Sequence, residues 1–165
     1  MPTLRVLRHA KSSWEHEGLA DHERPLNERG EREATRMGTY LRDVDEPPEL
    51  VLCSSALRTR QTLERLHLGG ARVEVEDELY GAPASALIER LRELHGEDSV
   101  LLIGHNPGVH GLVMVLAGDG EHLHDVATGF PTCALATLEF DGTWAGLGQG
   151  TATLTGYVTG KRLGA

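Results

Sequence analysis

The fold is first indicated by residues 100–105, which read Val-Leu-Leu-Ile-Gly-His. A continuous apolar run of this kind predicts a strand that is buried on both faces of a sheet. Similar apolar runs occupy residues 4–7 and 50–53, and segments with the three-to-four apolar spacing of helices separate the runs. This alternation predicts an α/β fold, a three-layer sandwich in which helices flank a mainly parallel central sheet.

Amphipathic helices are expected between and after these strands. They are predicted after residue 27 up to the prolines at 47 and 48, from about residue 56 to 66, from residue 83, and from residue 107. Ser54 and Ser55 are good N-caps for the second helix, and Asn106 and Pro107 suit the cap and first position of the last. The helices therefore begin directly after strand ends.

The remaining strands are less clear. Residues 73–75 alternate with charges, as in an edge strand. The C-terminal third predicts strands near residues 133–140 and 151–158, with Asp141 and Gly142 as a tight turn between them. These last strands are able to pair antiparallel at an edge of the sheet.

Composition restricts the class of protein. The chain of 165 residues has 16 Lys and Arg against 25 Asp and Glu and a formal net charge of -9, which disfavours nonspecific binding to nucleic acid or to anionic membranes. Its length predicts a single domain over residues 1–165. Cys53 and Cys133 lie in apolar runs and are expected to be buried free thiols, and the N-terminus does not resemble a signal peptide. A cytoplasmic protein without a nucleic acid or membrane partner is expected.

Chemically active side chains follow three of the apolar runs. Arg8 and His9 end the first run, Arg58 falls in the first turn of the helix after the second, and His105 ends the strand at residues 100–104. Ligands of parallel sheets bind beside the carboxyl ends of the strands. We therefore expect these four residues, which are far apart in the sequence, to converge on one crevice.

Two arginines and two histidines favour a site for a phosphoryl group. Arginine binds phosphate oxygens in pairs, and helix starts add backbone N–H donors. A neutral imidazole attacks phosphorus in line and is then released by water. His9 is the better placed nucleophile because it adjoins Arg8, and His105 is expected to donate a hydrogen bond to a phosphate oxygen.

A metal site is not expected. His105 with His110, and His122 with His124, lack the spacings of common zinc ligands.

These motifs resemble those of the histidine phosphatases, also called the phosphoglycerate mutase-like superfamily. The Arg-His-Gly or Arg-His-Ala signature of that family resembles residues 8–10, its second arginine motif resembles residues 54–62, and its second histidine motif resembles residues 104–107. The small size of the chain and its residues 24–30 and 78–82 are similar to the SixA-type phosphohistidine phosphatases. The resemblance extends from Leu4 to about Gly118.

The resemblance implies roles for particular residues. His9 would carry the phosphoryl group, Arg8 and Arg58 would bind its oxygens together with the second catalytic histidine, His105, and no metal or other cofactor would be needed. Arg24 is a further candidate for the pocket.

The general acid is where the sequence departs from the family pattern. Mutases and broad phosphatases of the family carry a glutamate that protonates an alkoxide leaving group, whereas here only Asp77 or Glu78 is near the expected place. A phosphorylated imidazole leaves once its own ring is protonated. The favoured substrate is therefore phosphohistidine on a protein, such as a histidine phosphotransfer component.

Two other functions stay open at this point. A phosphomonoesterase acting on small sugar or nucleotide phosphates would depend on Glu78. A phosphate-binding module would recognise a phosphorylated partner without turnover.

Overall fold

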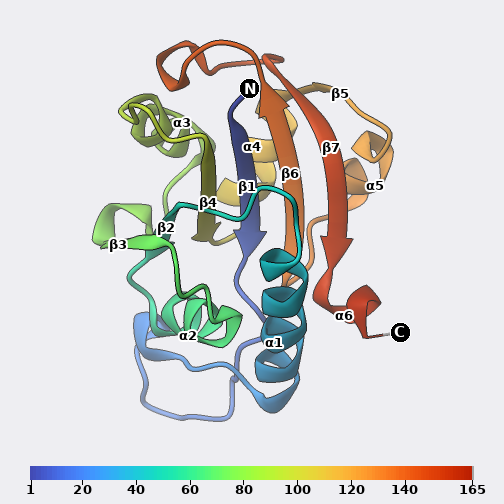
Figure 1. The fold of residues 1–165 in the computed structure, drawn as a ribbon. Helices are drawn as coiled ribbons and strands as arrows, with labels where there is room; N and C mark the ends of the chain where they lie inside the picture. Colours follow the sequence, from blue (N-terminus) through green and yellow to red (C-terminus); the bar gives the residue numbers. More distant parts are fainter. Residues whose placement is uncertain (165) are drawn as a thin grey trace.

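A single mixed sheet forms the centre of the computed structural model, which describes residues 1–164. Its seven strands lie in the order β3-β2-β4-β1-β6-β7-β5 (Figure 1). The strands are β1 Thr3–Arg8, β2 Leu50–Ser54, β3 Arg72–Glu76, β4 Ser99–Gly104, β5 Ala117–Asp119, β6 Ala134–Phe140 and β7 Ala152–Thr159. Neighbours pair parallel except β1 with β6 and β6 with β7, which are antiparallel. The predicted mainly parallel sheet is confirmed.

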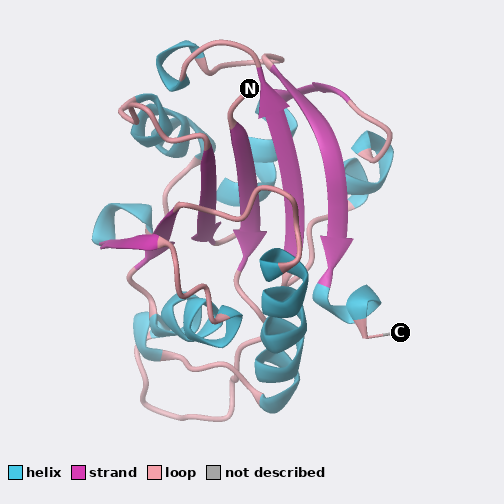
Figure 2. Ribbon diagram, in the orientation of Figure 1, coloured by secondary structure: helices cyan, strands magenta, loops and turns pink. Residues whose placement is uncertain are grey.

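Helices cover both faces of the sheet (Figure 2). They are α1 Glu28–Arg42, α2 Leu57–Leu66, α3 Ala84–Arg92, α4 Gly108–Leu116, α5 Leu123–Thr128 and α6 Gly160–Leu163, with short 3-10 turns at η1 Asp21–Glu23, η2 Asp77–Leu79 and η3 Trp144–Gly146. None of these helices is long and apolar enough to cross a membrane. Because helices lie on both faces of the sheet (Figure 2), the predicted three-layer sandwich is confirmed.

The alternation of side chains along β2 shows how the layers are joined. Leu50 and Leu52 belong to a buried cluster with residues of α3 and α4. Val51 and Cys53 belong to a second cluster with residues of α1 and α2. Successive side chains of a strand point to opposite faces, so a strand that is apolar throughout contributes to both cores.

The starts of two helices differ from the prediction. Ala56, without a side-chain hydrogen bond, occupies the N-cap position of α2, and Pro107 occupies that of α4. The predicted caps were therefore wrong. The side chains of Ser54, Ser55 and Asn106 instead form hydrogen bonds with partners distant in the sequence, which are His105, His22 and the Phe130 carbonyl oxygen respectively.

The first helix is also shorter than predicted. It begins after residue 27, as predicted, and Asn27 caps it through a hydrogen bond of 2.8 Å from the Gly30 N–H. It ends at Arg42, before the two prolines, and Val44 lies beyond its last turn. Gly30 lies so close to the Lys11 carbonyl oxygen that an added Cβ would stand 2.0 Å from it. The start of α1 and the loop after β1 are thereby packed backbone to backbone.

The C-terminal strands pair antiparallel, but the predicted tight turn between them is wrong. Residues 141–151 form a longer connection that contains η3. Trp144 anchors it: the side chain is buried, packs edge-on against Phe140 and donates its indole N–H to the Glu97 carbonyl oxygen at 2.7 Å. A buried tryptophan requires such a connection to fold back onto the core. Strand β5 and helices α5 and α6 were not predicted.

Both cysteines are buried free thiols, as expected. Burial raises the pKa of each thiol to about 12. Cys133 has a φ of 59°, and its N–H lies within hydrogen-bond distance of the Arg8 and His9 carbonyl oxygens. Cys53 directly precedes Ser54 at the end of β2. Cys133 is therefore adjacent to the end of β1, and Cys53 to the end of β2.

Candidate active site

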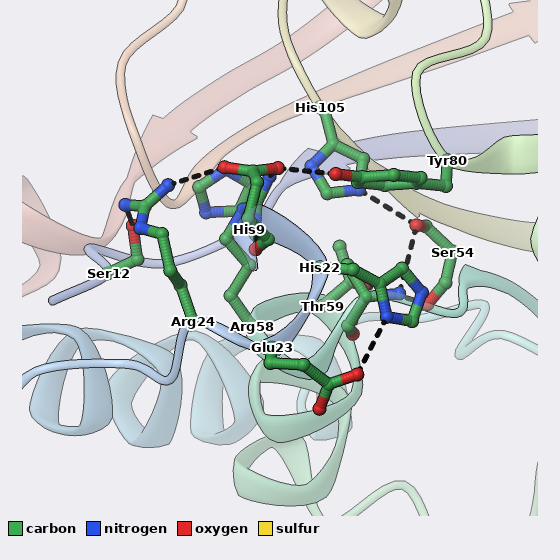
Figure 3. A network of polar contacts seen from close by, with 12 residues as sticks. His9, Ser12, His22, Glu23, Arg24, Ser54, Arg58, Thr59, Tyr80 and His105 are labelled. Atoms are coloured by element: carbon green, nitrogen blue, oxygen red, sulfur yellow. Dashed lines mark hydrogen bonds and ion pairs between the residues drawn. The ribbon is translucent and has the colours of Figure 1, made fainter. Parts of the chain in front are cut away.

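The two histidines of the predicted site follow neighbouring strands. Strands β1 and β4 pair in register, with Arg8 opposite Gly104, and the His9 N–H donates to the Gly104 carbonyl oxygen at 3.1 Å. The rings of His9 and His105 consequently lie side by side, with centroids 5.2 Å apart (Figure 3).

The tautomer of His9 follows from one hydrogen bond. Its Nδ1 lies 2.7 Å from the Ala10 carbonyl oxygen, which can only accept, so Nδ1 carries the proton. Burial, with the nearby cationic groups, lowers the pKa of His9 to about 3, against the opposing effect of the Ala10 carbonyl. At neutral pH the ring is uncharged, and its Nε2 has a free lone pair.

Arg8 forms the positive wall next to His9. It donates through Nη1 to the Phe130 carbonyl oxygen at 3.2 Å, and its Nε is buried without a partner among the described residues. Burial, and then the nearby Arg58 guanidinium, lowers the pKa of Arg8. Two guanidinium groups that raise each other's energy in this way favour the binding of an anion between them.

Arg58 lies in the first turn of α2, as the sequence predicted, and is buried. Its Nη1 donates to the Asp21 carbonyl oxygen at 2.7 Å, and its Nη2 donates to the Asp21 carboxylate at 2.9 Å.

His105 is held by the end of β2. Its Nε2 lies 2.8 Å from the Ser54 hydroxyl, and its Nδ1 is buried without a partner in the described part of the chain. Burial, followed by the charge of Arg58, lowers the pKa of His105 to about 4. Its hydrogen bond to a phosphate oxygen therefore requires the tautomer with a proton on the nitrogen that faces the anion, and this role stays a prediction.

Asn106 is a site residue that sequence reasoning treated only as a helix cap. Its Nδ2 donates to the Phe130 carbonyl oxygen at 2.8 Å, which also accepts from Arg8. One carbonyl thus ties the loop after β4 to the end of β1.

Arg24, which the sequence analysis gave as a further candidate for the pocket, lies in the pocket lining. It is buried and donates to the Ser12 hydroxyl, to the Ser13 carbonyl oxygen at 3.1 Å and to the Asp21 carboxylate at 3.0 Å. Its guanidinium also lies over the ring of Trp14, at 3.3 Å from the centroid.

Asp21 and Tyr80 were missed by the sequence reasoning. Besides the two arginines, the Asp21 carboxylate accepts a hydrogen bond of 2.5 Å from the Tyr80 hydroxyl. The Tyr80 ring stands edge-on to His105, with centroids 5.5 Å apart (Figure 3). Asp77 and Glu78, the two candidate acids, are exposed, and neither is among the residues that line the pocket.

A pocket of about 200 Å³ lies between the ends of β1 and β4, the loop after β1 and the start of α2. Its lining consists of Arg8, His9, Lys11, Ser12, Trp14, Arg24, Arg58, His105, Asn106 and Thr132. The four residues predicted to converge are therefore together, with a third arginine and a lysine beside them. No group of three or more His, Cys, Asp or Glu residues within residues 1–164 is placed to hold a metal ion.

Comparison with known proteins agrees with this geometry. The model of the histidine phosphatase superfamily (branch 1) matches residues 4–82. A protein assigned as the phosphohistidine phosphatase SixA of Nakamurella multipartitia is 30% identical, with a TM-score of 0.83 over 95% of each chain. The chain belongs to the histidine phosphatase superfamily.

Other relatives place this histidine phosphatase among the SixA-type members. A protein assigned as SixA of Agrobacterium tumefaciens is 30% identical, with a TM-score of 0.83 over 96% of this chain and 99% of that one. The protein histidine phosphatase SixA in complex with tungstate is 27% identical, with a TM-score of 0.78 over 98% and 99%. An uncharacterised protein of Mycobacterium tuberculosis is 39% identical over 92% of this chain and 98% of its own.

Proposed function

We propose that this histidine phosphatase hydrolyses phosphohistidine on a protein, and that Nε2 of His9 carries the phosphoryl group between the two steps. The observation that carries the proposal is the state of His9: an uncharged ring whose Nδ1–H is held by the Ala10 carbonyl, beside the guanidinium groups of Arg8 and Arg58. A nucleophile with a free lone pair and a fixed positive environment for the equatorial oxygens are what phosphoryl transfer requires.

The reaction consists of two in-line displacements. In the first, Nε2 of His9 forms a bond to phosphorus while the bond to the leaving group breaks, and Arg8 and Arg58 bind the equatorial oxygens. In the second, water attacks phosphorus, the bond to Nε2 breaks, and the proton that the water loses stays on the released phosphate. His9 returns to its neutral form with Nδ1–H in place. In this proposal the positive charge comes from the arginines, and no metal is required.

The surroundings of the leaving group support phosphohistidine over alkyl esters. An alkoxide needs a proton from a neighbouring acid, and Asp77 and Glu78 lie outside the pocket on the exposed η2. The related protein histidine phosphatase SixA forms a complex with tungstate, which supports an oxyanion as a ligand of this kind of protein. The proposed partner is a phosphorylated protein such as a histidine phosphotransfer component.

Trapping of the intermediate tests the proposal. The protein is mixed with a radiolabelled phosphohistidine protein and quenched in alkali, and the label is located by peptide mapping. We expect acid-labile label on His9 and release of phosphate. His9→Ala should abolish both, while His16→Ala, which changes an exposed histidine of the following loop, should affect neither.

Other results identify the alternatives. Faster turnover of sugar or nucleotide phosphates than of phosphohistidine, with dependence on Glu78, would make the protein a small-molecule phosphomonoesterase. Binding without any label on His9 would make it a phosphate-binding module. Turnover that survives His9→Ala would remove the mechanism.

A further inference from the structure

The Asp21 carboxylate has no role in the proposed reaction, although it joins three parts of the site. It accepts hydrogen bonds from Arg24, Arg58 and Tyr80, which belong to the loop before α1, to α2 and to the segment after β3. Its side chain is 48% exposed, whereas that of Arg58 is only 8% exposed. Asp21 therefore lies on the solvent side of the buried arginines.

The position of the leaving group follows from in-line geometry. His9 is buried at the end of β1, so a substrate reaches it from the solvent side. A displacement in line places the leaving group opposite the attacking nitrogen. The leaving group therefore lies toward the mouth of the pocket. The Asp21 carboxylate and the Tyr80 ring are not part of the pocket lining, but they contact lining residues from the solvent side: Asp21 accepts from Arg24 and Arg58, and Tyr80 stands against His105.

The charge of Asp21 limits what it does there. The hydrogen bonds from Tyr80, Arg58 and Arg24 hold the pKa of the carboxyl well below its usual range, against the opposing effect of burial. It is thus ionised at neutral pH and has no proton for an alkoxide. An ionised carboxylate accepts hydrogen bonds and attracts cations, and it repels an anionic leaving group.

We propose that Asp21 determines specificity: its carboxylate accepts a hydrogen bond from the protonated distal nitrogen of a phosphorylated imidazole and thereby selects phosphohistidine over phosphate esters. The inference rests on the proposed function and assigns the recognition of its leaving group. Arg58 remains able to bind the phosphoryl oxygens, because a guanidinium has more N–H donors than the two contacts with Asp21 use.

The transfer then takes place between two similarly held imidazoles. The bond from phosphorus to the substrate nitrogen breaks, its electron pair stays on that nitrogen, and the distal N–H remains, so that neutral imidazole leaves. The new bond joins phosphorus to Nε2 of His9, whose own distal N–H is held by the Ala10 carbonyl. In this proposal the Asp21 carboxylate accepts a hydrogen bond from the leaving ring, as the Ala10 carbonyl does from the attacking ring.

The test compares two leaving groups in Asp21→Asn, which keeps the shape and removes the charge. One substrate is phosphoimidazole, which has a distal nitrogen; the other is para-nitrophenyl phosphate, whose leaving group needs no proton. We expect kcat/KM to fall about 10- to 100-fold for phosphoimidazole, the factor of one hydrogen bond to a charged group. For para-nitrophenyl phosphate we expect it to stay within about threefold or to rise.

A pH profile adds a readout that a structural role would not move. The carboxylate stabilises the protonated ring of the bound substrate, so the alkaline limb of kcat for phosphoimidazole, which reports the pKa of the enzyme–substrate complex, should shift to lower pH in Asp21→Asn. Glu23→Gln is the matched control, because Glu23 lies in the same turn and contacts His22 rather than the arginines. This variant should have the same kcat/KM as the wild type for both substrates and the same pH profile.

The outcomes separate this inference from the proposed function. Equal losses for both substrates in Asp21→Asn would overturn the inference, because Asp21 would then act only by placing the arginines. No loss for phosphoimidazole would overturn it as well, while turnover by the wild type with label on His9 would leave the proposed function standing. A wild type that does not turn over phosphorylated imidazoles at all would overturn both.

Discussion

The inner wall and the outer rim of the pocket are held by different kinds of contact. The inner wall is formed by Arg8, His9 and Asn106. Its side chains are fixed to the backbone carbonyls of Ala10, just after β1, and of Phe130, between α5 and β6. The outer rim, formed by Asp21 and Tyr80, is held largely by contacts between side chains, with a further hydrogen bond from Arg58 to the Asp21 carbonyl oxygen. A carbonyl acceptor is present whatever residue supplies it, whereas a contact between two side chains is lost when either residue changes. Under the proposed function, the wall would perform the chemistry and the rim would select the substrate.

The largest effect is expected from the wall, at the nucleophile. His9→Ala should lower kcat for any phosphorylated substrate by on the order of 10⁴-fold or more, as loss of a catalytic nucleophile does. Steady-state rates with phosphoimidazole and para-nitrophenyl phosphate measure it. A loss confined to one of these substrates would contradict the assignment of His9 to the common chemistry.

A smaller but still general effect is expected for Arg58→Lys, at the boundary of wall and rim. Lysine keeps the charge but not the paired donors, so kcat/KM should fall by about 10²- to 10³-fold for both substrates, and inhibition by tungstate should weaken. Arg60→Lys is the control, since Arg60 is an exposed residue of the same helix. Tungstate inhibition unchanged in Arg58→Lys would remove Arg58 from the phosphate site.

Burial of the wall also predicts a dependence of stability on pH. Folding lowers the pKa of His9 from 6.5 to about 3. Between these pH values the unfolded chain binds more protons than the folded chain, so the free energy of unfolding falls as pH falls. His9→Asn should flatten the decline of the unfolding free energy between about pH 6.5 and pH 4 by on the order of 1 kcal/mol per pH unit. Denaturant titrations of both proteins measure the slopes. Parallel curves would contradict the shift.

The smallest effect is expected at the rim. Tyr80→Phe removes the hydroxyl that holds the Asp21 carboxylate, a single hydrogen bond in a partly exposed place. We expect kcat/KM for phosphoimidazole to fall by about 2- to 10-fold, with little change for para-nitrophenyl phosphate. A larger loss of kcat/KM for the aryl ester than for phosphoimidazole would show that Tyr80 contributes to phosphoryl transfer itself and not to recognition of the leaving group.

The same division explains which features were predictable from the sequence. Arg8 and His9 of the wall follow from local patterns, because apolar runs mark buried strands, and parallel strands bring their carboxyl ends to one edge. The rim depends on contacts between distant residues: Asp21 meets Arg58 and Tyr80, which lie 37 and 59 positions away. No periodicity within residues 11–24 indicates such contacts.

The errors in local structure have related causes. Ser54 and Ser55 have the right chemistry for helix caps, but His105 and His22 compete for their hydroxyls in the folded chain. Strand β5, Ala117–Asp119, is too short and too polar to produce a pattern, and it exists because β7 pairs with it. In both cases tertiary contacts outweigh local preference.

The two buried thiols allow opening of the sheet to be followed without any engineered probe. Cys133 is bonded through its backbone to the carbonyls of Arg8 and His9, and Cys53 adjoins Ser54. A thiol reagent reaches either sulfur only when the surrounding structure opens, because both side chains are fully buried. The labelling rates of the two cysteines therefore report separately on the integrity of the β1 and β2 sides of the pocket. Occupation of the pocket by an oxyanion, which binds both sides at once, should slow the two rates together.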